Sequence, residues 1–384
     1  IITEIIILNV LFFINSSNKK RRTKRHTNYS KIKNNWKGGI IMQKTKPVIA
    51  ITVGDPCGIG PEITAKALSN AEIYDMCCPV AISDADVMRQ AVEIAKVNLK
   101  INSVENLEDC KYEYGTIDVL NIKNVDVEVI QFGKVTKMGG EASFQYIVKG
   151  IQLALEGKVD AVTTGPIHKK AINLAGHEYS GHTEIFADYT KTKDYCMMLV
   201  DGDFRVSHVT THVSFRQVPD LVKKARVLKV IELTNEALIK MGIKQPRIAV
   251  AGLNPHSGEE GLFGREELEE IEPAIKEANQ IGIQAEGPVP PDTVFVKMRG
   301  GQYDAVVAMY HDQGHIPTKL VGFKYDDKLG KWGSVAGVNT TLGLPIIRTS
   351  VDHGVAFGKA GKGTANPESM IDAIKLAAVM AGKQ

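Results

Sequence analysis

The chain has 384 residues, and 43% of them are hydrophobic, which is enough to bury a large core. Of its 47 Lys and Arg and 44 Asp and Glu residues, nine basic and one acidic residue lie in 1–41. The remainder therefore holds 38 basic and 43 acidic residues, a net charge of −5. No basic patch is left to indicate nucleic-acid binding. The five cysteines, with Cys77 and Cys78 adjacent, show no disulfide framework or zinc-ribbon spacing, which favours a reduced, cytoplasmic compartment.

The first 41 residues are expected to be a disordered, translated leader that is not part of the native chain. An apolar run at 5–14 precedes a basic run at 19–25, which is the reverse of a secretory signal. The apolar run is also shorter than the roughly 20 residues that a membrane helix needs, so no membrane partner is expected. The segment before Met42 can be encoded by a purine-rich stretch typical of a bacterial ribosome-binding site. A genuine basic tail is the alternative.

After Met42, strand-like apolar runs alternate with helical patterns. The strand-like runs are Val48–Val53, Val80–Ile82, Val127–Ile130, Ala161–Thr164, Met197–Val200, Arg205–Val209, Ile248–Leu253 and Ala305–Met309. The helical patterns are Pro61–Leu68, Asp84–Ala95, Gly140–Leu155, Asp220–Met241, Glu266–Ile281 and Pro367–Met380. Several runs are apolar on both faces, which is typical of a parallel or mixed sheet covered by helices. The alternation predicts an α/β fold. Lys324–Gly337 is polar and glycine-punctuated, so we expect a surface loop or hairpin there.

The first strand-like run leads into Gly54-Asp-Pro-Cys-Gly-Ile-Gly-Pro-Glu62, at the start of a helical pattern. Glycines let backbone approach a ligand closely, and a helix start attracts anions. The segment lacks the Gly-Lys-Ser/Thr of a Walker loop and is not a clean GxGxxG. A tight strand–helix turn is the alternative. Further along, His182 and Thr183 begin a helical pattern, where an imidazole and a hydroxyl could meet a substrate anion.

Three histidines, His212, His256 and His311, each lie just past the end of a strand-like run. Open α/β sheets bind ligands at the carboxyl ends of their strands, and imidazole is the commonest metal ligand. Three neutral imidazoles would leave open positions for substrate oxygens, and a metal that chelates a hydroxyl acidifies it. Asp292 and Asp312 could orient ligands or take protons. Three ordinary buried or capping histidines are the alternative.

The C-terminal region holds further polar candidates. Lys319 and Arg348 suit a phosphate or carboxylate, and Asn339 adds a directional hydrogen bond. Taken singly, each is also typical of a solvated surface. The glycine-rich segment Ser350–Pro367 precedes the last helical pattern and could wrap a cofactor, since loops of this length are usually functional or disordered.

Together and in this order, from about Val48 to Met380, these motifs resemble the 4-hydroxythreonine-4-phosphate dehydrogenase (PdxA-type) family. The last segment also resembles the glycine-rich segment of isopropylmalate and isocitrate dehydrogenases, which lies against the adenine side of their dinucleotide. The resemblance implies their two-lobed α/β fold, with 42–384 as one catalytic unit of two interleaved lobes and the site in the cleft. It also makes Asp352, His353 and Gly354 candidates for binding NAD.

The resemblance further implies NAD-dependent, divalent-metal-assisted oxidation and decarboxylation of a four-carbon 4-phosphorylated 3-hydroxy acid, as in pyridoxal phosphate biosynthesis. The ion would be Zn, Mg, Co or similar. Metal ligands are implied at His212, His256 and His311. Substrate contacts are implied at His182, Thr183, Lys319, Asn339 and Arg348. The family is homodimeric and draws its metal ligands from both chains.

One departure from the family pattern bears on the substrate. Where the vitamin B6 enzymes have Gln-Gly-Leu-Pro-Val-Leu-Lys, this chain has Gln313-Gly-His-Ile-Pro-Thr-Lys319. His315 resembles the branch that acts on D-threonate or D-erythronate 4-phosphate and yields dihydroxyacetone phosphate, which makes it a candidate for substrate selectivity. Two other classes stay open: a metal-dependent lyase or hydrolase acting on a phosphorylated sugar acid, and a non-catalytic phosphometabolite-binding protein.

Overall fold

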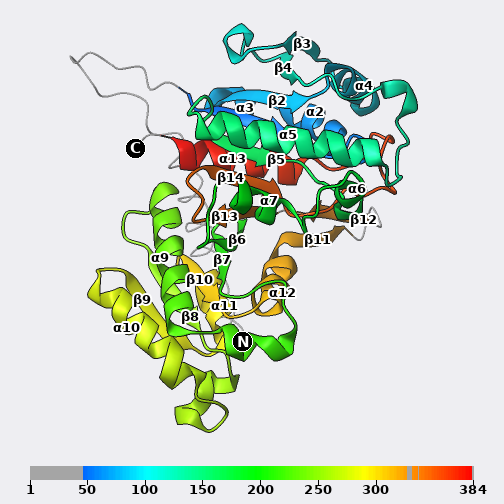
Figure 1. Ribbon diagram of the computed structural model, residues 1–384. Coiled ribbons are helices and arrows are strands. Elements are labelled where there is room, and N and C mark those ends of the chain that lie inside the picture. Colours follow the sequence, from blue (N-terminus) through cyan, green and yellow to red (C-terminus); the bar gives the residue numbers. More distant parts are fainter. Residues whose placement is uncertain (1–45, 327–330, 336, 383–384) are drawn as a thin grey trace, which may run out of the picture. The chain divides into compact units, whose positions relative to one another are not determined.

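The computed structural model describes residues 46–326, 331–335 and 337–382, and the expected leader at 1–41 lies outside them. Within these residues, twelve strands form one sheet in the order β3-β4-β2-β1-β5-β14-β13-β6-β7-β10-β8-β9 (Figure 1). The strands are β1 (Val48–Thr52), β2 (Cys78–Ser83), β3 (Lys100–Val104), β4 (Thr116–Asn121), β5 (Ala161–Thr164), β6 (Cys196–Asp201), β7 (Phe204–His208), β8 (Arg247–Ala251), β9 (Gln284–Val289), β10 (Ala305–Ala308), β13 (Val338–Leu342) and β14 (Ile347–Val351).

Helices connect most of these strands. They are α2 (Gly60–Leu68), α3 (Ala71–Met76), α4 (Ala85–Ala95), α5 (Lys137–Leu155), α6 (Lys169–Leu174), α7 (His182–Tyr189), α8 (Val218–Leu221), α9 (Lys224–Lys240), α10 (Glu272–Gln280), α11 (Pro291–Arg299), α12 (His311–Gly322) and α13 (Glu368–Ala381). Polar side chains fix several helix starts by accepting from free backbone N–H groups. Asp84 caps α4 in this way, and Thr136 caps α5 with a bond of 3.0 Å from Gly139.

Strand direction changes in the middle of the sheet. The pairs β14–β13, β13–β6 and β6–β7 are antiparallel. The pairs on both sides of them are parallel, as in β1–β5 and β7–β10. The predicted α/β fold with a mixed, largely parallel sheet covered by helices is therefore confirmed. Three reversals leave β7, β10 and β8 running opposite to β1, β5 and β14.

Alternating side chains along the strands explain how both faces are covered. In β5, Val162 contacts Gly150 of α5, whereas the hydroxyl of the next residue, Thr163, lies 3.0 Å from that of Thr349. The Thr349 hydroxyl in turn donates to the carbonyl of Ala373 in α13. Helices α5 and α13 therefore cover opposite faces of this part of the sheet.

The other half of the sheet repeats the arrangement. Ile248 and Val250 of β8 share a buried cluster with residues of α9 and α10. Ala249 and Ala251, which point the other way, share a second cluster with Val294 of α11. Strands buried on both faces give the continuous apolar runs seen in the sequence.

Most predicted elements are confirmed to within a few residues, but the strand predicted at Val127–Ile130 is wrong. Val127–Val129 form a single 3-10 turn, which Asp126 caps by accepting from the N–H of Glu128 at 3.0 Å. None of these residues is buried, so the apolar run does not contribute a strand to the core of the sheet. In the range of the predicted loop or hairpin, Lys324–Gly337, β11 (Phe323–Asp326) pairs antiparallel with β12 (Lys331–Val335), and residues 327–330 and 336 lie outside the described residues. None of the described helices is long and apolar enough to cross a membrane.

The contact between α5 and α6 gives a test of the fold. A Cβ at Gly140 would overlap the carbonyl oxygen of Ala171, so the helices must separate to admit one. We expect Gly140→Ala to lower the free energy of unfolding by about 1–3 kcal/mol, measured by urea denaturation. Gly358→Ala is the matched control, because a Cβ there meets nothing within 4 Å. Equal stability of the two variants would contradict this packing.

Candidate active site

The histidines that follow β7 and β10 lie next to each other. These strands pair in parallel, with Val206 opposite Val306, so both chains leave the sheet at the same edge. His311 is the first residue of α12, His212 lies just after β7, and their ring centroids are 5.8 Å apart. Two imidazole ligands of one metal ion have centroids roughly 5–6 Å apart, because a metal–nitrogen bond is about 2.0–2.1 Å long. The pair therefore fits two ligand positions of a single ion.

Polar contacts orient the start of α12. Asp312 Oδ1 lies 2.7 Å from His311 Nδ1, which leaves Nε2 of this ring for a metal or a substrate. The Gln313 side chain ties the same turn to the sheet. Its Oε1 accepts from the N–H of Met309 at 2.7 Å, and its Nε2 donates to the carbonyl of Gly252 at 2.8 Å.

The third predicted ligand, His256, lies in an unusual turn. Pro255–Gly261 follows β8, and residues 256–260 all have positive φ. A buried carboxylate, Glu267, holds the approach to the turn. Its Oε1 accepts from the backbone N–H groups of Leu253 at 2.8 Å and Asn254 at 2.7 Å. The turn is thus fixed from inside, while His256 itself is exposed.

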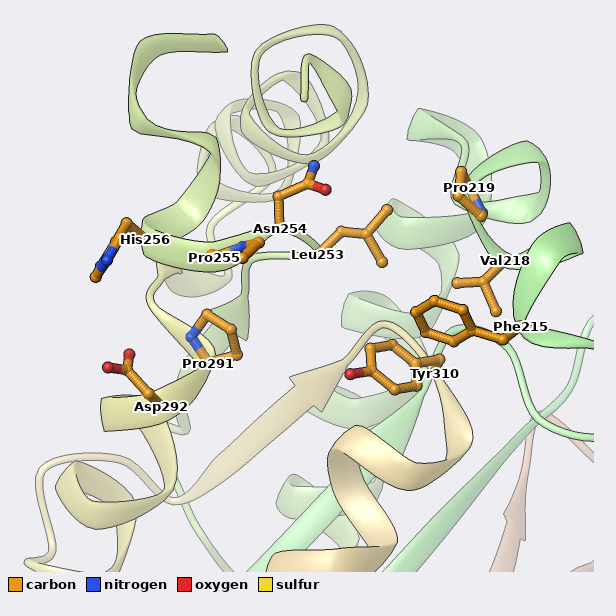
Figure 2. Close-up of a pocket in the computed structure, with 10 residues that line it drawn as sticks. All are labelled: Phe215, Val218, Pro219, Leu253, Asn254, Pro255, His256, Pro291, Asp292 and Tyr310. Carbon is orange, nitrogen blue, oxygen red and sulfur yellow. The ribbon is translucent and has the colours of Figure 1, made fainter. Parts of the chain in front are cut away.

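His256 and Asp292 line a pocket of about 520 Å³. Figure 2 draws them at one end of the pocket, with Phe215 and Tyr310 at the other. The rings of Phe215 and Tyr310 meet edge to face at 5.4 Å, and Phe215 is 72% exposed. An exposed aromatic side chain beside a pocket is typical of a surface that binds a ligand or a protein partner.

The structure thus brings two of the three predicted metal ligands together. Within the described residues of one chain, no three His, Cys, Asp or Glu side chains are grouped closely enough to hold a metal ion. His212 and His311 fit an ion in part, and any third ligand to it has to come from outside this group.

A buried cation lies on the central strands. The Arg348 guanidinium is 3% exposed and donates to the hydroxyls of Thr341 at 3.0 Å and Thr164 at 2.9 Å. Its Nε is buried without a hydrogen-bond partner. Burial lowers the pKa of Arg348 to about 9 and the charge of Glu184 opposes this, so the group stays charged at neutral pH. No carboxylate among the described residues forms an ion pair with it. A buried cation with neutral partners is a strong site for an anion.

The start of α7 lies near this cation. His182 is its first residue, Thr183 its second, and Phe186 lies under the guanidinium at 5.6 Å. Burial, together with the charge of Arg348, holds the pKa of His182 well below its usual range. The ring is therefore neutral, and its buried Nε2 has no partner. Free N–H groups at a helix start favour anions, so α7 and Arg348 suit the same ligand.

Three more predicted residues flank this region. The Asn339 amide donates to Met197 Sδ at 2.9 Å, and its buried Oδ1 has no partner. Lys319 Nζ lies 4.0 Å from Asp352 Oδ2. Burial raises the pKa of Asp352, and the Lys319 charge opposes that rise. A predicted substrate residue therefore meets the first residue of the predicted cofactor group.

The rest of the cofactor group follows β14. His353 Nδ1 lies 3.0 Å from the carbonyl of Gly354, and burial lowers the pKa of this imidazole. A Cβ at Gly354 would meet nothing within 4 Å, so the backbone is open to a ligand there.

His315 belongs to a row of imidazoles that runs into the sheet. Its ring stacks on that of His311 at 3.6 Å and lies 4.8 Å from that of His208. Its Nδ1 lies 3.0 Å from the carbonyl of His311. Burial lowers the pKa of His315 to about 4 and that of His208 to about 3, so both rings are neutral.

Sequence reasoning missed Glu184 and Lys169. The charges of both act on His212, and Glu184 also acts on Arg348, so Glu184 lies near both the predicted metal residues and the predicted substrate residues. The Lys169 ammonium chain approaches Gly181, which precedes α7. The available signal was proximity in sequence, since Glu184 is two residues from His182. The hydroxyls of Thr164 and Thr341 gave no signal, because both lie within β-strands.

Comparison with known proteins gives consistent matches. The model of the family described as "Pyridoxal phosphate biosynthetic protein PdxA" matches residues 75–377. A Clostridium botulinum protein named "Putative D-threonate 4-phosphate dehydrogenase" is 46% identical over 337 residues, covering 88% of this chain and 98% of its own. A "4-hydroxythreonine-4-phosphate dehydrogenase" of Desulforapulum autotrophicum is 46% identical over 341 residues, covering 88% and 97%. The crystal structure of the enzyme of that name from Klebsiella pneumoniae has a TM-score of 0.79 at 41% identity, covering 89% and 100%.

The neutral buried histidines predict a pH dependence of stability. The pKa of His208 falls from 6.5 to about 3 on folding. Between these two pH values the His208 imidazole is therefore protonated in the unfolded chain but neutral in the folded protein. The free energy of unfolding should therefore fall as the pH drops through this window, by up to about 1.4 kcal/mol per pH unit for one such group. We expect a shallower fall for His208→Leu in urea denaturation between pH 7 and 4. Parallel curves for the two proteins would contradict this assignment.

Proposed function

The chain belongs to the family of the pyridoxal phosphate biosynthetic protein PdxA, and from that premise we propose that it oxidises and decarboxylates a four-carbon 4-phosphorylated 3-hydroxy acid with NAD. Its relatives are named dehydrogenases, and it is an oxidoreductase. We further propose that residues 42–384 act in the cytoplasm as one catalytic unit of two interleaved lobes with the site in the cleft.

One observation carries the choice of a phosphorylated substrate. Arg348 is a buried cation that two threonine hydroxyls orient, and although the charge of Glu184 acts on it, no described carboxylate forms an ion pair with it. His182 adds a buried nitrogen without a partner at the start of α7. Leaving a buried charge unpaired is costly, so an anionic ligand stabilises this arrangement. We assign the phosphate to Arg348, His182 and Thr183.

The divalent metal is proposed at His212 and His311, where it would polarise the substrate's hydroxyl and carboxylate. Asp312 orients His311 for this role. His256 would complete the ligand set from a second chain, which makes the protein a homodimer. The exposed position of His256 on a pocket rim supports this, as do Ile316 and Leu320, which are 65% and 80% exposed on α12.

The remaining residues receive roles from their positions. Asn339 has a free buried Oδ1 to accept from a substrate hydroxyl. Lys319 would hold substrate oxygens and face Asp352, the first of the residues proposed to meet the dinucleotide. NAD would take the hydride from the alcohol carbon. Asp292 lies beside the His256 pocket and would orient groups or accept protons at the shared site.

Two substrates fit this assignment. 4-Phosphohydroxy-L-threonine is the substrate type in the name of the Desulforapulum autotrophicum relative. D-Threonate or D-erythronate 4-phosphate, with a hydroxyl in place of the amino group, is the second candidate. The observation that favours it is His315, whose buried imidazole stacks on His311 and gives the metal side of the site a polar surface.

A substrate panel tests the proposal. The protein is incubated with NAD and each of 4-phosphohydroxy-L-threonine, D-threonate 4-phosphate and D-erythronate 4-phosphate, and absorbance at the NADH band is followed. We expect NADH from at least one substrate, and its loss after a chelator removes the metal. Product without NADH would support the metal-dependent lyase or hydrolase instead. Binding with neither product nor NADH would support a phosphometabolite-binding protein, and full activity after metal removal would exclude the metal's role.

The role of His315 gives a separate test. Replacing it by Leu removes the polar surface beside His311 but keeps similar bulk. We expect His315→Leu to lower kcat/KM for the threonate or erythronate phosphate at least about tenfold more than for 4-phosphohydroxy-L-threonine, a shift of about 1.4 kcal/mol in selectivity. His177→Leu, at a histidine that pairs with Glu141 at 2.8 Å, is the control and should leave the ratio unchanged. An unchanged ratio in His315→Leu would remove this residue from substrate selection.

A further inference from the structure

The glycine-rich turn between β1 and α2 is packed inside the protein. Every residue from Gly54 to Pro61 is buried. A Cβ at Gly54 would overlap the backbone of Pro166, and one at Gly60 would overlap the carbonyl of Val53. These glycines therefore allow close packing of the chain on itself. The turn that resembled a ligand loop in sequence has its close contacts with protein backbone.

What this turn and α2 do hold is the glycine-rich segment near the C-terminus. Glu62 Oε1 accepts from the N–H of Gly361 at 3.1 Å. Lys66 Nζ donates to the carbonyls of Gly363 at 2.8 Å and Ala365 at 2.7 Å. Glu62 and Lys66 are four residues apart and share one face of α2. Two charged side chains of one helix thus form hydrogen bonds with three backbone groups that lie about 300 residues away in sequence.

The remaining contacts of the segment are equally close. The N–H of Ile59 donates to the carbonyl of Val355 at 3.1 Å. Gly361 and Gly363 have positive φ, and a Cβ at either would strike the Phe132 ring or the carbonyl of Ile94 respectively. Close packing therefore restricts the backbone conformation of the segment, and the hydrogen bonds from Glu62 and Lys66 stabilise the conformation observed.

Burial makes the hydrogen bonds of Glu62 and Lys66 energetically significant. Glu62 is 2% exposed, and its second oxygen, Oε2, is buried without a partner. Burial raises the pKa of Glu62 and lowers that of Lys66, and the charge of each opposes the shift of the other. Charges are costly to bury unless their hydrogen bonds hold a defined geometry. The geometry fixed here is that of the segment directly after Asp352, His353 and Gly354.

We propose that Glu62 and Lys66 are positioning residues for the dinucleotide. They hold residues 361–365 so that the preceding backbone at 352–354 is already ordered when the dinucleotide binds, which reduces the entropy lost on binding. This inference rests on the proposed NAD dependence. Neither side chain needs to touch NAD for the effect.

Kinetics separate this role from a general structural one. We expect Lys66→Met to raise the KM for NAD about tenfold, because two hydrogen bonds from a charged donor are lost. The KM for the phosphorylated substrate, and kcat at saturating NAD, should stay within about twofold. Glu62→Gln keeps an oxygen for the Gly361 N–H, so it should recover most of what Glu62→Leu loses.

Lys375→Met is the matched control. Its ammonium pairs with Glu72 at 2.6 Å, tying α13 to α3 without touching the segment, and its KM for NAD should not change. Equal rises for Lys66→Met and Lys375→Met, or rises in both KM values together, would overturn the inference.

Hydrogen–deuterium exchange gives a readout that needs no turnover. Residues 352–366 of the intact protein should exchange faster in Lys66→Met than in the wild type, and NAD alone should slow exchange there at lower concentration in the wild type. If NAD leaves this segment of the wild type unprotected, the inference is overturned whatever the assays give. Protection by NAD without NADH from any substrate would instead overturn the proposed reaction.

Discussion

The three antiparallel pairings at the centre of the sheet determine where a site can form. They turn β7, β10 and β8 against the direction of β1, β5 and β14, so the carboxyl ends of the two sets do not share one edge. Most of the candidate residues accordingly lie on or beside the four central strands, β14, β13, β6 and β7, whereas His256 and Asp292 lie beyond them. β14 carries Arg348, β13 carries Asn339 and Thr341, and β7 carries His208. Helix α12 lies against β6 and β7 and adds His311 and His315, while α7 adds His182.

The electrostatics of this region follow from burial. His182, His208 and His315 are all held neutral, so their nitrogens remain available as ligands or hydrogen-bonding groups at any ordinary pH. Arg348 keeps its charge because its pKa, though lowered, stays above neutrality. The result is a cation that two hydroxyls bind, with the neutral imidazole of His182 and the charge of Glu184 nearby. An oxyanion completes such a site better than water does, because the interaction with the guanidinium is strengthened by the low local dielectric.

The sequence predicted the elements that have a clear period and missed those that do not. β5 was predicted with its observed bounds because Ala161–Thr164 joins two apolar residues to two β-branched threonines and is followed directly by a glycine. β13 and β14 were missed, since Asn339, Arg348 and several threonines interrupt the apolar pattern inside the sheet. Two of these polar residues, Arg348 and Thr341, belong to the proposed anion site. A segment that must present polar groups from a buried strand loses the signal by which strands are recognised.

The same limit applies to side-chain neighbours. The nearness of His212 and His311 follows from β7 and β10 pairing in parallel, a long-range fact that spacing along the chain does not contain. The hydrogen bonds that orient the Arg348 guanidinium depend in the same way on Thr164 and Thr341, which lie on neighbouring strands. Sequence could identify residue types suited to metal and phosphate, but only the sheet order decides which of them meet.

The turn that carries His256 is costly to form, yet it leaves His256 apart from His212 and His311 of the same chain. A run of positive φ values in non-glycine residues costs free energy, as does burying the Glu267 carboxylate that anchors the turn. Despite this cost in free energy, His256 is exposed and lies apart from His212 and His311 of its own chain. Strain of this kind persists where a fixed geometry serves a ligand or a partner. In the proposed homodimer, His212 and His311 of a second chain would meet His256 at the edge of its pocket, and the rigid turn would hold His256 in place for the metal. This arrangement would explain why the three histidines share a pattern in sequence yet remain separated within one chain.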